Sequence, residues 1–281
     1  MKGNHGELLT SANQLEYGRL SLKVNDVDVE IATASRGGEL APIVFVHGFG
    51  STKEDYVDMS LHSTLSRHAF FAFDTPGCGE STCSDLPKVD ISFLVATTLA
   101  VLRQVGIEKF HLVGHSMGGL TALVLADTYP DRILIFIDIK GNLAPEDCFL
   151  SRQIFQYPSG DVHVFFNDFI ERTRRSASFS SAIYAATLRH KVQPGVVRGI
   201  FESMVELSDN GDLLTKYLAL PCPKMFMYGH ENRTLSYLPR LGANGVELAE
   251  IEHSGHFPMY SNPVEMWRRI SDFLGRLDLA S

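Results

Sequence analysis

The sequence has 281 residues, of which 44% are hydrophobic and 21% charged, a composition typical of a globular protein with a sizeable buried core. Its 25 lysines and arginines against 33 aspartates and glutamates give a formal net charge of −8. This balance disfavours nucleic acid or an anionic membrane as the main partner and favours a small-molecule substrate.

Two further features bear on where the protein works. Residues 1–7 lack the apolar stretch of a signal peptide, and the longest apolar run, at 133–137, is too short to span a bilayer. The cysteines are scattered and form no Cys-x-x-Cys pair; they are Cys78, Cys83, Cys148 and Cys222. We therefore expect a cytoplasmic protein with free thiols.

The predicted elements begin with two β-rich stretches, 17–24 and 27–34. The turn-forming pair Asn25-Asp26 joins them, which predicts an antiparallel hairpin at a sheet edge. Short apolar runs, typical of strands buried on both faces, follow at 43–46, 69–73, 110–113, 133–139 and 224–228. Helical patterns such as 93–105 and 120–128 separate these runs. This alternation predicts a doubly wound, mostly parallel α/β sheet.

The strand pattern stops between residues 144 and 208. Helix-like stretches at 145–155 and 161–176 replace it, and aromatic residues are concentrated there. We expect a helical cap, 144–208, inserted into a core of residues 1–143 and 209–281. The cap would cover the carboxyl edge of the sheet, where open α/β sheets bind ligands. A strand at 245–251 and a helix at 263–277 close the chain.

The pentapeptide Gly114-His115-Ser116-Met117-Gly118 lies between an apolar strand and a helix. A serine on such a sharp strand-to-helix turn presents its hydroxyl above the sheet, and the flanking glycines leave room for the close approach of neighbouring elements. The start of a helix also favours negative charge. This context predicts that Ser116 is a nucleophile.

A serine nucleophile requires a base. His256 is the best of eleven histidines, because it lies in the glycine-containing loop Ser254-Gly255-His256-Phe257-Pro258 between the last strand and the last helix. An oxyanion hole is predicted from the backbone amides of Phe49, in His47-Gly48-Phe49-Gly50, and Met117.

Four segments occur in order across nearly the whole chain: a strand followed by His-Gly-x-Gly, Asp-x-Pro-Gly-x-Gly-x-Ser, Gly-His-Ser-Met-Gly-Gly and Ser-Gly-His-Phe-Pro. Together they resemble the α/β-hydrolase superfamily, in its capped esterase and lactonase branch. The dehalogenases and epoxide hydrolases of that branch use an aspartate nucleophile, and serine at position 116 argues against them.

The resemblance implies a carboxylate that orients the histidine, and here the pattern departs from the family. The usual acid position, after the strand at 224–228, is Asn232, with Glu231 one residue earlier. Some relatives place the acid 24 residues after the nucleophile, which here is Lys140. A lysine there would have Asp138 as its only obvious anion, unless its ammonium reaches solvent.

Three explanations follow from this departure. Asp138 or Glu231 serves as the acid, Lys140 replaces a glutamate and impairs the site, or the protein binds a ligand without hydrolysing it. We favour Lys140 at an acid position, so that Lys140→Glu raises hydrolysis.

The sequence thus predicts a serine hydrolase that cleaves a carboxylic ester or lactone through an acyl-enzyme intermediate. The aromatic cap favours an apolar or aromatic substrate. The motifs fit an amidase, a thioesterase or a carbon–carbon bond hydrolase equally well. No metal or organic cofactor is implied, and a homodimer is compatible with the sequence.

Overall fold

The computed structural model describes residues 14–158, 161–176 and 179–278. The prediction that residues 1–7 form no signal peptide concerns residues outside these ranges. Within them, no helix is both long and apolar enough to cross a membrane. All four cysteines lie in the described ranges and are free thiols.

The described residues form a nine-stranded sheet with the strand order β1-β2-β4-β3-β6-β7-β8-β9, and β5 pairs with β2. The strands are β1 (Glu16–Val24), β2 (Val27–Arg36), β3 (Leu40–Val46), β4 (His68–Phe73), β5 (Thr82–Cys83), β6 (Phe110–His115), β7 (Ile133–Ile139), β8 (Lys224–Gly229) and β9 (Glu247–Ile251). β2 pairs antiparallel with β1, β4 and β5. The remaining pairs are parallel, which confirms the predicted edge hairpin and mostly parallel sheet.

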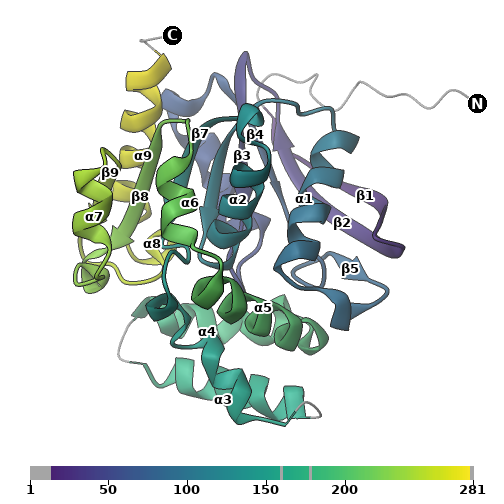
Figure 1. Cartoon of the computed structure of the whole chain (residues 1–281). Helices are drawn as coiled ribbons and strands as arrows, with labels where there is room; N and C mark the ends of the chain where they lie inside the picture. The colour runs from purple at the N-terminus through teal and green to yellow at the C-terminus, as the bar shows by residue number, and fades with distance from the viewer. Residues whose placement is uncertain (1–13, 159–160, 177–178, 279–281) are drawn as a thin grey trace, which may run out of the picture.

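Helices lie on both faces of the sheet, as a parallel sheet requires. In Figure 1, α1 (Ile91–Gln104), α2 (Met117–Thr128) and α6 (Leu213–Ala219) lie in front of the sheet, and α9 (Pro263–Asp278) lies behind it. Trp267 of α9 is fully buried, with its ring 5.8 Å from that of Phe45 on β3. Two short helices, α7 (Leu238–Ala243) and α8 (Pro258–Ser261), flank β9.

The long connection between β7 and β8 contains α3 (Val162–Arg174), α4 (Phe179–Lys191) and α5 (Val197–Asn210). Figure 1 shows the three helices grouped at one end of the sheet. The helix-like stretch predicted at 145–155 is instead two 3-10 turns, η5 (Pro145–Cys148) and η6 (Ser151–Gln156). The Asp147 carboxylate accepts hydrogen bonds from the backbone amides of Leu143 and Ala144, which stabilises η5 as a separate turn. The limits of the cap, 144–208, stay a prediction, although α5 continues to Asn210.

Candidate active site

The candidate nucleophile lies on a strained turn. Ser116 lies between the last residue of β6 and the first residue of α2. Its φ is 52° and its ψ is −119°, a backbone conformation that residues other than glycine rarely adopt. The close packing predicted around it is present. A Cβ atom on Gly118 would lie 2.1 Å from the carbonyl oxygen of Val46, and one on Gly114 would lie 2.6 Å from that of Gly118. Neither glycine therefore tolerates a side chain in this geometry.

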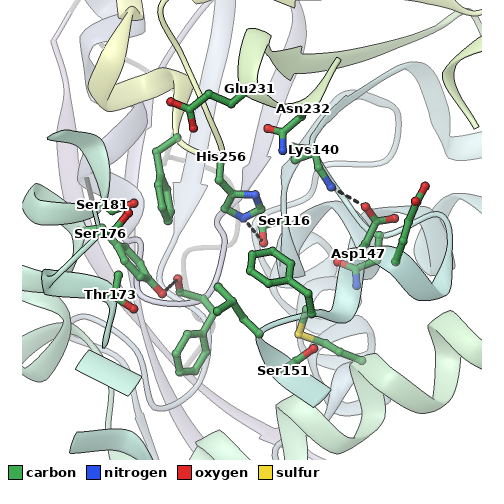
Figure 2. Close-up of a pocket in the computed structure, with 18 of the residues that line it drawn as sticks. Ser116, Lys140, Asp147, Ser151, Thr173, Ser176, Ser181, Glu231, Asn232 and His256 are labelled. Atoms are coloured by element: carbon green, nitrogen blue, oxygen red, sulfur yellow. Dashed lines mark hydrogen bonds and ion pairs between the residues drawn. The ribbon is translucent and has the colours of Figure 1, made fainter. Parts of the chain in front are cut away.

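The candidate base reaches this serine. His256 lies in the loop between β9 and α8. Its Nε2 atom is 2.8 Å from the Oγ atom of Ser116 (Figure 2). On the other side of the loop, Nε2 of His115 donates a hydrogen bond of 2.8 Å to the backbone carbonyl of His256. His115 thus fixes the backbone that carries the candidate base.

The environment of His256 keeps its imidazole uncharged. Burial lowers its pKa well below the ordinary histidine value, and the nearby His115 and Lys140 lower the pKa further. A neutral imidazole can accept a proton from a serine hydroxyl, so this environment suits a general base at neutral pH.

The predicted oxyanion donors follow two neighbouring strands: Phe49 lies in the loop after β3, and Met117 begins α2 after β6. Among the described residues, neither the amide of Phe49 nor that of Met117 donates a hydrogen bond to another part of the chain. The carbonyl oxygen of Phe49 accepts a hydrogen bond of 2.8 Å from the Tyr184 hydroxyl of α4. The helix α4 therefore holds the Phe49–Gly50 peptide, next to the peptide that carries the Phe49 N–H.

Lys140 is paired, although with neither of the partners expected from the sequence. Its Nζ atom lies 2.5 Å from Oδ1 of Asp147 on η5, and the Lys140 side chain is only 6% exposed. The expectation that its ammonium contacts Asp138 or reaches solvent was therefore wrong. Its backbone φ of 49° turns the chain at the end of β7, so that the side chain points toward η5 (Figure 2). The Tyr237 hydroxyl donates a further hydrogen bond to the same carboxylate oxygen, at 3.0 Å.

Asp138 lies beneath the nucleophile turn and is not hydrogen-bonded to His256. Its Oδ1 accepts a hydrogen bond of 2.7 Å from the amide of Gly141, and within the described ranges its Oδ2 has no partner. A Cβ atom on Gly119 would lie 2.6 Å from Oδ1, which places the carboxyl group against the start of α2. Burial raises the pKa of Asp138 to about 7. A carboxyl group in this position is partly protonated at neutral pH.

Glu231 is also not hydrogen-bonded to His256. It lies on η9 (His230–Asn232), where its amide donates to the carbonyl of Ser254 at 3.1 Å. Its carboxylate lies against Gly255, because a Cβ atom there would be 2.4 Å from Oε2. In Figure 2 this carboxylate lies to the upper left of the imidazole and the amide of Asn232 to its upper right. The structure thus brings Ser116 and His256 together and hydrogen-bonds neither carboxylate candidate to the histidine.

A pocket of about 330 Å³ lies above Ser116 and His256, between the sheet core and the α3–α5 layer. Part of its wall is apolar and aromatic: Phe49, Leu150, Phe169, Tyr184, Phe201, Met204 and Phe257. The polar lining residues include Lys140, Asn142, Asp147, Ser151, Thr173, Ser176, Ser181, Glu231 and Asn232. No group of three metal-ligating side chains occurs in the part of the chain that the structure describes.

Sequence reasoning missed Asp147 and Tyr184. Both come from the connection between β7 and β8, and both fix a residue of the core by one polar contact. The only local signal for Asp147 is the acidic pair after Ala144-Pro145, which is typical of a helix start. Tyr184 was included only among the aromatic residues of the predicted cap, and no pattern in the sequence points to its bond with Phe49.

Comparison with known proteins agrees with this architecture. The sequence model described as "Alpha/beta hydrolase family" matches residues 43–269. The chain belongs to this family. Among curated α/β-hydrolase relatives, the pimeloyl-[acyl-carrier protein] methyl ester esterase of Aeromonas hydrophila is 24% identical over 260 residues, 86% of this chain and 99% of that protein.

Other matches cover only part of a longer protein. The dihydrolipoyllysine-residue acetyltransferase component of the acetoin cleaving system of Cupriavidus necator is 33% identical over 110 residues, 39% of this chain. The match covers 29% of that protein, and 26% of the corresponding Pseudomonas putida protein.

Solved structures share the fold. A carboxylesterase structure from Nitrososphaera gargensis superimposes with a TM-score of 0.74 at 18% identity, over 94% of this chain and 100% of that chain. An N-acyl homoserine lactonase bound to N-hexanoyl homoserine gives a TM-score of 0.69 at 18% identity, over 93% and 96%. At these identities the similarity establishes the α/β-hydrolase fold alone.

Proposed function

We propose that this α/β hydrolase cleaves a carboxylic ester or lactone through an acyl-enzyme intermediate formed on Ser116. The observation that carries the proposal is the 2.8 Å approach of His256 Nε2 to Ser116 Oγ on a strained strand-to-helix turn. His256 would take the hydroxyl proton as Ser116 attacks the carbonyl carbon, and then pass it to the leaving oxygen. The same histidine would next activate the water that releases the acid.

The negative charge of the tetrahedral intermediate needs donors. The amides of Phe49 and Met117, which have no partner among the described residues, would hold the oxyanion in this scheme, which requires no metal or organic cofactor. The aromatic wall of the pocket supports a small, apolar or aromatic substrate. Relatives named esterase and lactonase support the reaction class.

A second candidate function is ligand binding without efficient turnover. The observation in its favour is that no carboxylate among the described residues is hydrogen-bonded to His256, while Lys140 lies nearby as a cation. The first candidate is preferred because the serine and the histidine are already in hydrogen-bond contact.

The test is hydrolysis of short-chain and medium-chain p-nitrophenyl esters and of aryl-substituted lactones, with Ser116→Ala as the matched control. Turnover that disappears in Ser116→Ala supports a serine hydrolase. Amide, thioester and vinylogous 1,5-diketone substrates in the same panel separate the amidase, thioesterase and carbon–carbon hydrolase alternatives. The proposal fails if no substrate is turned over while the unmodified protein still binds panel ligands in the pocket.

A further inference from the structure

One nitrogen of the His256 ring has no partner. Nε2 faces Ser116, and among the described residues no group is hydrogen-bonded to Nδ1. For Nε2 to accept the serine proton, the neutral ring must carry its own proton on Nδ1, which makes Nδ1 a donor. A donor in this sheltered position requires an acceptor nearby to fix the tautomer and the orientation of the ring.

One amide oxygen beside the ring also has no partner. Oδ1 of Asn232 is buried and has no hydrogen-bond partner within the described ranges. Figure 2 shows the Asn232 amide next to the imidazole of His256, with its nitrogen end toward the ring. The loops that carry the two residues are packed together, because the amide of Glu231 donates to the Ser254 carbonyl at 3.1 Å.

A single rotation would direct these two groups toward each other. A half-turn about the Cβ–Cγ bond of an asparagine exchanges the positions of its oxygen and nitrogen. At Asn232 this rotation directs the unpartnered oxygen toward the unpartnered Nδ1–H of His256. A buried polar atom without a partner destabilises the fold, so an arrangement that gives the buried Asn232 Oδ1 a donor is favoured.

We propose that Asn232 is the positioning residue of this site, with its amide oxygen accepting the Nδ1–H hydrogen bond of His256. The inference rests on the proposed function, since it assigns the third role in the same reaction. The resemblance to the family leads one to expect a carboxylate here. An amide can orient the ring and select the tautomer as a carboxylate does, but it adds no charge to stabilise the imidazolium.

The charged groups around the ring are consistent with a neutral partner. His115 lies at the end of β6, and Lys140 follows β7 with its charge balanced by Asp147 on η5. Glu231, on η9, has its carboxylate against Gly255, to the upper left of the ring in Figure 2. None of these groups is hydrogen-bonded to Nδ1 within the described ranges.

The first test does not depend on turnover. In the ¹⁵N-labelled protein, a hydrogen-bonded Nδ1–H gives a downfield proton signal, assigned by its loss in His256→Gln. We expect this signal in the wild type and its loss in Asn232→Leu, which keeps the volume and removes the acceptor. In Asn232→Asp we expect the pKa of His256 to rise by about one unit or more. Asn244→Asp makes the same charge change at an exposed position and should leave that pKa unchanged.

Kinetics supply the second test. Asn232→Leu should lower kcat about tenfold or more with KM within twofold of the wild type, because the ring loses its orientation and the pocket does not. Asn232→Asp should restore or raise kcat and move the acid limb of kcat/KM to higher pH. The inference is overturned if the Nδ1–H signal persists in folded Asn232→Leu, or if Asn232→Asp leaves the pKa of His256 unchanged. Turnover that survives Ser116→Ala would instead overturn the proposed function and leave the spectroscopic test intact.

Discussion

The Nζ atom of Lys140 lies 2.5 Å from the Asp147 carboxylate, and the two side chains are 6% and 1% exposed. A cation and an anion that are both sheltered from water stabilise the fold only as a pair, because either one alone is a buried charge without compensation. The pair also joins the end of β7 to the first turn of the connection that follows it.

The first prediction concerns this pair. Lys140→Met and Asp147→Asn should each lower the free energy of unfolding, by up to about 3–5 kcal/mol. The double variant should lose clearly less than the sum of the single losses. Urea unfolding of the four proteins measures the coupling, and additive losses would show that the two charges do not stabilise each other.

The effect of a glutamate at position 140 follows from the same pair. The sequence alone led us to expect that Lys140→Glu raises hydrolysis, and the pairing with Asp147 changes this expectation. Lys140→Glu alone would place two carboxylates together in a sheltered site, so we now expect it to lower stability and to give no gain in hydrolysis. Lys140→Glu combined with Asp147→Asn removes this repulsion. It is the fair test of whether position 140 can supply an acid, with kcat on the preferred ester as the readout. A gain in Lys140→Glu alone would contradict this expectation.

The second prediction concerns pH. Because the pKa of His256 is lowered by burial and by nearby His115 and Lys140, the acid limb of kcat/KM should lie below pH 6.5. Lys140→Met removes one of these cationic contributions and leaves Asp147 unpaired, and both effects raise the histidine pKa. The acid limb should therefore move to higher pH in this variant. An unchanged profile would mean that another group titrates.

The third prediction concerns Asp138. Its pKa is about 7 in the folded protein and about 3.9 in an unfolded chain, so the folded state holds the proton more tightly. Its contribution to stability is complete below about pH 4 and is lost as the pH rises toward 7. Asp138→Asn should remove this loss, and at pH 8 the variant should be more stable than the wild type, by at most about 4 kcal/mol. Chemical unfolding at pH 4 and at pH 8 checks the difference, which should be small at the lower pH.

The fourth prediction concerns Tyr184. Tyr184→Phe removes the hydrogen bond to the carbonyl of Phe49 and leaves the ring stack with Phe257 in place, whose centroids are 4.4 Å apart. The hydrogen bond holds the Phe49–Gly50 peptide, which adjoins the peptide that carries the Phe49 N–H, so without it kcat should fall roughly tenfold with little change in KM. The melting temperature serves as the control, because loss of a single neutral hydrogen bond costs only about 1 kcal/mol. Equal effects on KM and kcat would instead indicate a direct contact with substrate.

Much of the architecture could be predicted from the sequence, because it follows from local patterns. Continuous apolar runs predicted the central strands to within a few residues, and the glycines around Ser116 predicted a turn that only small residues allow. His256 could be predicted as the base because its loop lies between the last strand and the last helix. The 2.8 Å approach of the two side chains agrees with that inference.

The surroundings of the histidine could not be predicted in this way. The direction of Lys140 depends on a left-handed backbone conformation after β7 and on the 3-10 turn that carries its partner. Neither is encoded in hydrophobic periodicity. Asn232 was recognised only as a departure from the family pattern. The role proposed for its amide depends on the imidazole of His256, which lies 24 residues later in the chain.

The ion pair between Lys140 and η5 also affects how chimeric proteins should be built from this scaffold. The turn Pro145–Cys148 follows the predicted cap boundary in sequence, yet it holds a cation that acts on His256. A graft that exchanges the helices above the pocket would keep this electrostatic setting only if the new segment began after Cys148. A junction at residue 144 would also replace Asp147, the partner of Lys140. The rate of hydrolysis and the substrate selectivity would then change together.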